Sequence, residues 1–161
     1  MIDTGSSENL YGSFADEDTG LLFLAGSKGT LLRSADLGAT WNAVPSGSDQ
    51  ELRRLWRDSR SRTLLCFGAH GALLRSPDDG RSWRAAVSGT DGVLRRIINE
   101  PGTNHLLLVG GQGTLLRSTD GGRTWEKLDT HTQRHFNSMA ADQQSGDLVL
   151  VGERIVRLVR R

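Results

Sequence analysis

The sequence is poor in several features, and each shortage excludes a class of protein. It has one cysteine, Cys66, so neither an internal disulfide nor a cysteine-based zinc site can form. Its longest apolar runs, such as Leu21–Ala25, have about five residues, whereas a membrane-spanning helix needs about 20. The chain also has almost no excess of one charge, because 20 Lys and Arg residues are balanced by 19 Asp and Glu residues. We therefore expect no transmembrane helix and no overall field that attracts nucleic acid.

Glycine, by contrast, is abundant and regularly spaced. The chain has 20 glycines among 161 residues, and similar residues recur at steps of 42. Two sets mark this register: Gly26, Gly68, Gly110 and Gly152, and Leu10, Leu52, Leu94 and Phe136. A period of about 40–45 residues with several short strands in each unit is typical of β-propeller blades.

An eight-residue motif, Ser-x-Asp-x-Gly-x-(Thr/Ser)-Trp, occurs three times in this register. Its copies are Ser34–Trp41 (SADLGATW), Ser76–Trp83 (SPDDGRSW) and Ser118–Trp125 (STDGGRTW). Asp and Ser side chains accept backbone N–H bonds in turns, and glycine adopts the left-handed conformation that closes them. A catalytic or metal-binding Asp is needed once, whereas this Asp recurs in every complete unit. We therefore expect the motif to be structural, with its tryptophans packed between units. Its residues are Ser34, Asp36, Gly38, Trp41, Ser76, Asp78, Gly80, Trp83, Ser118, Asp120, Gly122 and Trp125.

Each unit is predicted to form four short strands, because apolar runs alternate with Gly, Asp and Ser clusters. The first strands are expected at Leu10–Ala15, Leu52–Arg57, Leu94–Asn99 and Phe136–Ala141. The second are expected at Leu21–Ala25, Leu64–Phe67, Leu106–Val109 and Leu148–Val151. The third are expected at Thr30–Arg33, Ala72–Arg75 and Thr114–Arg117, and the fourth at Trp41–Val44, Trp83–Val87 and Trp125–Leu128. Gly-x-x-Gly joins the second strand to the third, and both glycines are expected to permit positive φ.

The predicted fold class is therefore all-β, a β-propeller of four-stranded blades with a 42-residue period. The blades are expected at residues 10–51, 52–93, 94–135 and 136–161 of one domain. The last unit reaches its third strand with one residue lost and has no motif copy. We expect about four blades, as an open arc or as part of a larger propeller. An open arc exposes apolar blade faces, so self-association through the open blade edges is also expected.

The motif resembles the Asp-box, or BNR repeat, and its blades resemble those of the photosystem II stability/assembly factor-like family. Unit three carries the resemblance most closely, in Gly113–Trp125 (GTLLRSTDGGRTW), whereas Leu37 replaces a glycine in unit one. The resemblance implies a non-catalytic propeller that acts as a scaffold for assembling membrane or exported proteins. It also implies a protein partner, such as an acidic segment of a membrane-protein assembly intermediate.

Asp-boxes also occur in sialidases and other glycoside hydrolases, so a hydrolase fragment is the alternative. A sialidase needs an arginine trio and a Tyr nucleophile paired with Glu. Tyr11 is the one tyrosine here, and the matching positions hold Arg53, Arg95 and Asn137. The residues therefore favour the non-enzymatic interpretation.

Arginines gather on the expected first strands of two neighbouring units. Arg53 and Arg54 lie on one strand, and Arg95 and Arg96 hold the matching positions on the next. If these strands are innermost, the four form a local basic patch, and arginine binds carboxylate or phosphate through two hydrogen bonds. The patch is our candidate partner-binding site. The alternative is ion pairing between blades, with Asp16, Asp58, Glu100 or Asp142 as partners.

Other patterns do not predict a cofactor, a metal or a nucleic acid. Gly110–Gly113 resembles a phosphate loop, but it precedes a strand rather than a helix. His131 and His135 lack the additional ligands of a metal site. Leu52–Arg62 is basic, but one short basic strand is a small footprint for nucleic acid.

The expected location depends on where translation starts. No basic segment followed by an apolar stretch appears near Met1, so the printed sequence predicts no signal peptide. We expect a cytoplasmic protein if Met1 is the natural start. The family resemblance implies a periplasmic or otherwise exported protein if a signal lies upstream.

Overall fold

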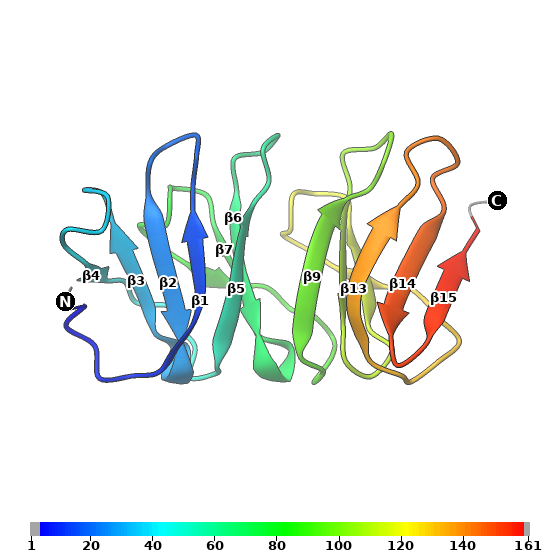
Figure 1. Ribbon diagram of the computed structural model, residues 1–161, viewed down its shortest axis with the longest axis horizontal. Helices are drawn as coiled ribbons and strands as arrows, with labels where there is room; N and C mark the ends of the chain where they lie inside the picture. The colour runs from blue at the N-terminus through cyan, green and yellow to red at the C-terminus, as the bar shows by residue number, and fades with distance from the viewer. Residues whose placement is uncertain (1–3, 160–161) are drawn as a thin grey trace.

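The computed structural model describes residues 4–159 as four antiparallel sheets that stand side by side in an arc (Figure 1). The first three sheets have four strands each, in chain order, and the fourth has three. Met1 and the last two residues of the expected fourth blade lie outside the described residues. No helix within the described range is long and apolar enough to cross a membrane.

Strands in equivalent positions begin at nearly constant intervals. The innermost strands are β1 (Leu10–Ala15), β5 (Leu52–Arg57), β9 (Leu94–Asn99) and β13 (Phe136–Ala141). The second strands are β2 (Leu22–Gly26), β6 (Leu64–Gly68), β10 (Leu106–Gly110) and β14 (Leu148–Gly152). The third strands are β3 (Leu31–Ser34), β7 (Leu73–Ser76), β11 (Leu115–Ser118) and β15 (Ile155–Leu158). The outermost strands are β4 (Asn42–Ala43), β8 (Arg84–Ala85) and β12 (Glu126–Lys127), and two short 3-10 turns are η1 (Ser27–Gly29) and η2 (Ala69–Gly71).

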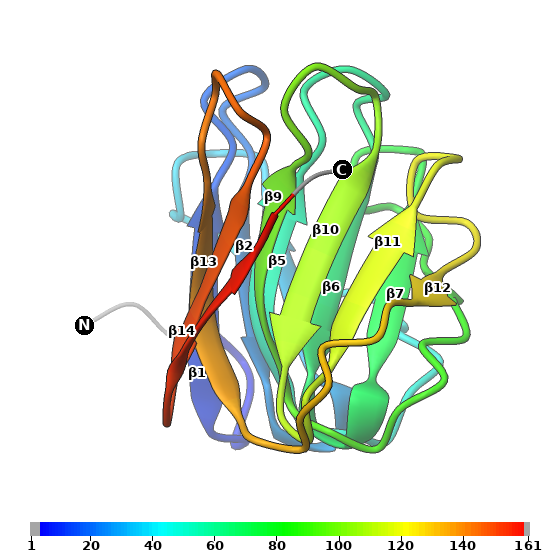
Figure 2. The ribbon, with the colours of Figure 1, turned by 90° about the vertical axis from the view of Figure 1, so that its right-hand side faces the viewer.

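The apolar cores lie between neighbouring sheets. Along β6, Leu64 and Cys66 pack in the core shared with the first sheet, whereas Leu65 and Phe67 pack in the core shared with the third. Successive side chains of a strand point to opposite faces, so a strand buried on both faces reads as a continuous apolar run. Figure 2 shows the same layering from the end of the arc, with β13, β14 and β15 in front. This stacking is that of a partial β-propeller and confirms the predicted fold class.

The outermost strands are shorter than expected, with two residues each. In the first sheet, Leu32 pairs with Ala43 and Arg33 with Asn42. Pairing ends there, and the hydroxyl of the next residue on the third strand, Ser34, bonds to Asp36 and to the Gly38 N–H of the turn.

The prediction for the hairpin glycines is half wrong. Gly29, Gly71 and Gly113 have positive φ values of 68°, 66° and 65°. Gly26 and Gly68, by contrast, have extended backbones with φ of −157° and −170°. A side chain at Gly68 would collide with the backbone of Glu51. The first glycine is therefore required by a close approach between strands.

In the fourth sheet, the connection between the second and third strands is two residues shorter than in the other sheets. The sequence predicted a loss of one residue. Val151 pairs with Ile155, whereas the matching pair in the third sheet is Val109 with Leu115. Arg157 therefore faces Val149 across the sheet. The arrangement of the sheets as one incomplete propeller domain stays a prediction.

Candidate functional site

The three Asp-box turns have the same hydrogen bonds. In the second, the Ser82 N–H donates to Asp78 Oδ1 at 2.9 Å, and the Gly80 N–H donates to Ser76 Oγ at 2.9 Å. The Ser76 hydroxyl donates to Asp78 Oδ1 at 2.8 Å. Matching bonds from Thr40 and Thr124 reach the aspartates of the first and third turns, at 2.9 Å and 3.0 Å. Each Asp therefore accepts hydrogen bonds within its own turn.

These hydrogen bonds lower the pKa values of the three aspartates to about 2. At Asp36 the largest cause is the hydrogen bond from the Thr40 hydroxyl. At Asp78 and Asp120 desolvation is the largest influence and raises the pKa, but several hydrogen bonds together outweigh it. The carboxylates are ionised at neutral pH and have no proton to give as a general acid.

The second and third turns also pack against the sheet that precedes each of them. A side chain at Gly80 would collide with the ring of Phe23 in the first sheet, and one at Gly122 would lie 2.9 Å from Leu65 Cδ2 in the second. Trp83 is buried in the core between the first two sheets, and Trp125 packs against the next core. The turns therefore hold neighbouring blades together.

The innermost strands carry the second group of candidate residues, which we call the arginine surface: Arg53, Arg54, Arg95 and Arg96. The strands β5 and β9 are in contact, so the blade stacking brings these residues together. A cavity of about 460 Å³ is lined by Arg53, Arg54 and Arg95. An adjoining cavity of about 290 Å³ is lined by Arg54, Arg95 and Arg96. No carboxylate lines either cavity among the described residues.

The predicted ion pairs between blades do not involve the arginine surface. Arg53 bonds to Glu51, the residue just before its own strand, and the Arg95 Nη1 donates to Asn137 Oδ1 at 2.6 Å. The side chains of Arg54 and Arg96 are exposed and make no hydrogen bond or ion pair within residues 4–159. The Arg95 Nε is buried without an acceptor in that range. The surface thus has guanidinium groups that can donate hydrogen bonds to an anionic partner.

Two neighbours of this surface have positions matching Arg53 and Arg95 on the flanking strands. Tyr11 lies on β1, and its ring centroid is 5.9 Å from the Arg53 guanidinium carbon. Asn137 lies on β13, and both residues line the larger cavity. The 42-residue register already aligned these four positions, but only the stacked strands place them around one space.

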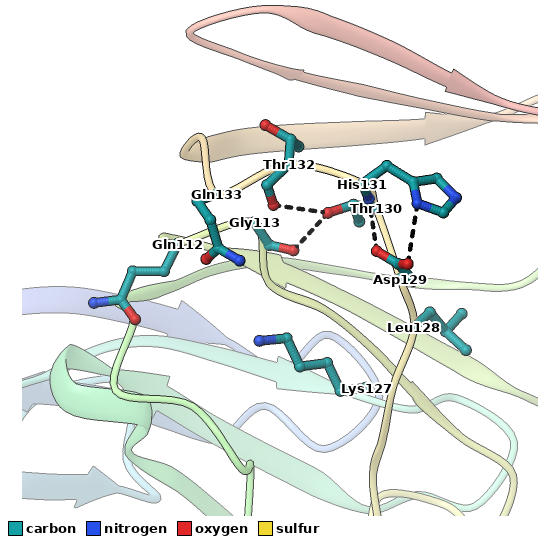
Figure 3. Close-up of a pocket in the computed structure, with 9 residues that line it drawn as sticks. All are labelled: Gln112, Gly113, Lys127, Leu128, Asp129, Thr130, His131, Thr132 and Gln133. Atoms are coloured by element: carbon teal, nitrogen blue, oxygen red, sulfur yellow. Dashed lines mark hydrogen bonds and ion pairs between the residues drawn. The ribbon is translucent and has the colours of Figure 1, made fainter.

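Figure 3 shows a separate hollow at the edge of the third sheet, between the β10–β11 connection and the segment after β12. Lys127 extends there toward Gln112 and Gln133 (Figure 3). The Thr130 hydroxyl donates to the Gly113 carbonyl at 2.9 Å, and His131 Nδ1 lies 3.0 Å from Asp129 Oδ2.

The hollow repeats a feature of the other sheets. The Thr130 hydroxyl donates to the Thr132 carbonyl at 3.3 Å, as Ser46 does to Ser48 and Ser88 to Thr90. A larger hollow occupies the matching place on the first sheet, around Gly29 and Ser46. We therefore regard this feature as part of the blade connection, and the arginine surface as the candidate site.

The fold is that of a partial β-propeller, and its three turns resemble Asp-boxes. The family model of the BNR/Asp-box repeat matches residues 116–127. A comparison with curated proteins gave no match. Many solved structures are similar, and they show the fold.

Two of these structures are of YCF48. YCF48 from Cyanidioschyzon merolae is 13% identical with a TM-score of 0.65, and the match covers 92% of this chain and 49% of that one. YCF48 bound to D1 peptide is 19% identical with a TM-score of 0.61, and the match covers 91% and 47%. An ancestral GH74 enzyme is 16% identical with a TM-score of 0.71, and the match covers 93% and 22%.

The chain spans about half the length of these YCF48 structures and about a fifth of the GH74 enzyme. It carries an Asp-box repeat and resembles YCF48 in fold, as expected from its motifs. The similar structures include both an enzyme and a peptide-bound protein, so the fold alone does not assign catalysis.

Proposed function

We propose that this chain is part of a non-catalytic propeller that binds an acidic protein segment at its arginine surface. One observation carries the proposal: four arginines of two stacked inner strands line adjoining cavities that no carboxylate lines among the described residues. The basic character is local, because the formal net charge of the chain is only +1.

The hydrogen-bonding state of these arginines suits an anionic ligand. The guanidinium groups of Arg54 and Arg96 have no partner within residues 4–159, so binding a carboxylate there breaks no protein hydrogen bond. Arg95 has a buried Nε without an acceptor. A guanidinium group donates two parallel hydrogen bonds to a carboxylate, and partial enclosure strengthens them relative to bulk water.

The comparisons support a protein partner. A protein of similar fold, YCF48, has been solved bound to D1 peptide. Together with the motif resemblance, this supports a scaffold role in which the acidic segment belongs to a membrane-protein assembly intermediate. A role in photosynthesis, or in the assembly of other membrane or exported proteins, is part of the same proposal.

A fragment of a glycoside hydrolase is the second candidate, favoured by the TM-score of 0.71 to an ancestral GH74 enzyme. Glycoside hydrolysis commonly uses two carboxyl groups, about 5–10 Å apart, on either side of the scissile bond. The cavities at the arginine surface have no such pair in the described part of the chain. The peptide-binding proposal therefore fits this chain better.

The test is the affinity for a fluorescein-labelled peptide with four consecutive aspartates, measured by anisotropy at low and moderate salt. An Arg53→Glu, Arg54→Glu, Arg95→Glu, Arg96→Glu variant should bind at least tenfold more weakly. The matched control changes four exposed arginines away from the cavities, Arg62, Arg81, Arg84 and Arg123, also to Glu. It has the same net charge and should retain most of the affinity.

Equal affinity of the two variants would contradict the proposed site, because the effect would then be one of net charge alone. The hydrolase alternative has its own assay, the release of a fluorophore from a sialoside or another glycoside. Turnover that Tyr11→Phe abolishes would contradict the non-catalytic interpretation.

A further inference from the structure

The sheets at the two ends of the arc each have one apolar face that no other sheet of the described residues covers, although Leu32 on the first sheet is only 3% exposed. On the first sheet this face includes Leu10, which is 37% exposed, whereas the matching Leu52 is fully buried against the first sheet. Trp41 lies near the same face and is more exposed than the matching Trp83.

The exposed face of the fourth sheet is the one that, in the other sheets, packs on the next sheet along the chain. Val151 and Ile155 are 41% and 74% exposed. They pair with each other as Ala25 does with Leu31, and both of these are buried against the second sheet. The outer face of the fourth sheet therefore corresponds to the faces that pack on the next blade along the chain. The outer face of the first sheet corresponds to the faces on which the preceding blade packs.

The polar contacts between blades show the same complementarity. The Arg33 Nε donates to the Asp79 carbonyl of the next turn at 2.9 Å, and the Arg75 Nε donates to the Gly121 carbonyl at 3.2 Å. Arg157 holds the position of Arg33 on the fourth sheet. Its side chain is 66% exposed and bonds to Asp147 of its own sheet.

The remaining acceptor of this type is on the first sheet. The Leu37 carbonyl matches those of Asp79 and Gly121, and it accepts no hydrogen bond within residues 4–159. The neighbouring Asp36 is ionised. At the complete interface between the second and third sheets, the matching Asp120 acts through its charge on Arg75. Arg157 at one end of the arc thus complements the Leu37 carbonyl and the Asp36 carboxylate at the other end in hydrogen bonding and charge.

We propose that two copies of this chain join head to tail into a closed ring of eight blades. The fourth sheet of each copy packs on the first sheet of the other, and Arg157 of each donates to the Leu37 carbonyl of the other. Two identical interfaces close the ring, and eight blades lie within the range of known propellers. Each chain matches 49% or 47% of a YCF48 chain, so two copies have about the length of one.

The first test is the molar mass of the 161-residue chain by sedimentation, from micromolar to submillimolar concentration. We expect a discrete species of twice 17.6 kDa. Ile155→Arg on the fourth sheet and Leu10→Arg on the first should each give monomers. The matched control is Val87→Arg, which changes a residue that is 84% exposed and lies on neither end face, and it should stay dimeric. Circular dichroism checks that each variant is folded.

A mixing experiment then tests the head-to-tail geometry. Ile155→Arg and Leu10→Arg chains each lack one face, but an equimolar mixture keeps one intact pair of faces and should regain a dimer. A monomer at every concentration would overturn the proposal and leave the end faces to other blades or another partner. An open series of polymers, a dimeric Ile155→Arg variant, or no association in the mixture would also overturn it. The assembly does not depend on peptide binding, so either proposal can fail alone.

Discussion

Leu37 is the residue at which the first Asp-box turn differs most from the third. Its φ is 57°, in the left-handed region, where the third turn has Gly121 with φ of 71°. The left-handed conformation costs a residue with a Cβ about 1–2 kcal/mol. Leu37 is also 83% exposed, so its side chain contributes little apolar burial in return.

We predict that Leu37→Gly stabilises the protein. The relief of strain exceeds the extra backbone entropy of glycine, which costs about 0.5–1 kcal/mol. The net gain should be about 0.5–1 kcal/mol, or a rise in Tm of about 2 °C for a chain of this size. The measurement is thermal unfolding at a fixed protein concentration. Gly121→Leu, the reverse change in the third turn, should lower the Tm, and a lower Tm for Leu37→Gly would refute the strain argument.

The three turn aspartates make stability depend on pH. Their folded pKa values of about 2 lie below the value of about 3.9 expected in an unfolded chain. A lowered folded pKa adds stability that is complete above the unfolded pKa and is lost as the pH falls toward the folded pKa. Urea unfolding should therefore show a loss of stability between about pH 4 and pH 2.

Asp78→Asn should reduce this pH dependence, because one of the three carboxylates is removed while an acceptor oxygen remains. Asp91→Asn is the control, since Asp91 is exposed and lies outside the turns. An unchanged slope in Asp78→Asn would show that the acid sensitivity arises elsewhere.

The hydrogen bonds of the Ser and Asp side chains in the turns could be predicted from sequence, because their partners lie within the same eight residues. The contacts of Gly68 could not, because the nearby backbone of Glu51 belongs to another strand. A glycine that recurs in a repeat indicates that a side chain is unfavourable at that position. It does not indicate whether the cause is a positive φ or a close neighbouring atom. The hairpin prediction was wrong at that point.

Among the elements, β5 provides a buried ionic link between sheets. Arg57, at its end, pairs with Asp16 at 2.6 Å and with Asp79 at 2.9 Å. The side chains of Arg57 and Asp16 are only 4% and 3% exposed. The sequence placed Asp16 among possible partners of arginines, but the particular pair depends on the rotation between two blades.

We predict that Arg57→Ala destabilises the protein by about 3–5 kcal/mol, because Asp16 is then left buried without its ionic partner. Arg57→Ala with Asp16→Asn should recover part of this loss, since the unpaired charge is gone. Chemical denaturation measures both variants. Arg96→Ala, which removes an exposed arginine without a partner, should change the unfolding free energy by less than about 0.5 kcal/mol. Equal losses for Arg57→Ala and Arg96→Ala would contradict the importance of the buried pair.

At the scale of the whole molecule, the 42-residue period determines the architecture. It predicted the four sheets and the innermost position of β1, β5, β9 and β13, because each unit repeats the same strands in the same order. It also predicted that the arginines of β5 and β9 are neighbours. The sequence could not show that the side chains of Arg54 and Arg96 lack partners within residues 4–159, because such partners come from side-chain geometry across blades.

The central claim is that the arginine surface binds an acidic segment of a protein. The most direct measurement is an NMR titration of the labelled chain with the tetra-aspartate peptide, following backbone amide and arginine side-chain signals. We expect the largest shifts at Arg53, Arg54, Arg95 and Arg96, with smaller ones at Tyr11 and Asn137. Shifts centred on the hollow around Lys127 and His131, or no shifts at saturating peptide, would contradict the account.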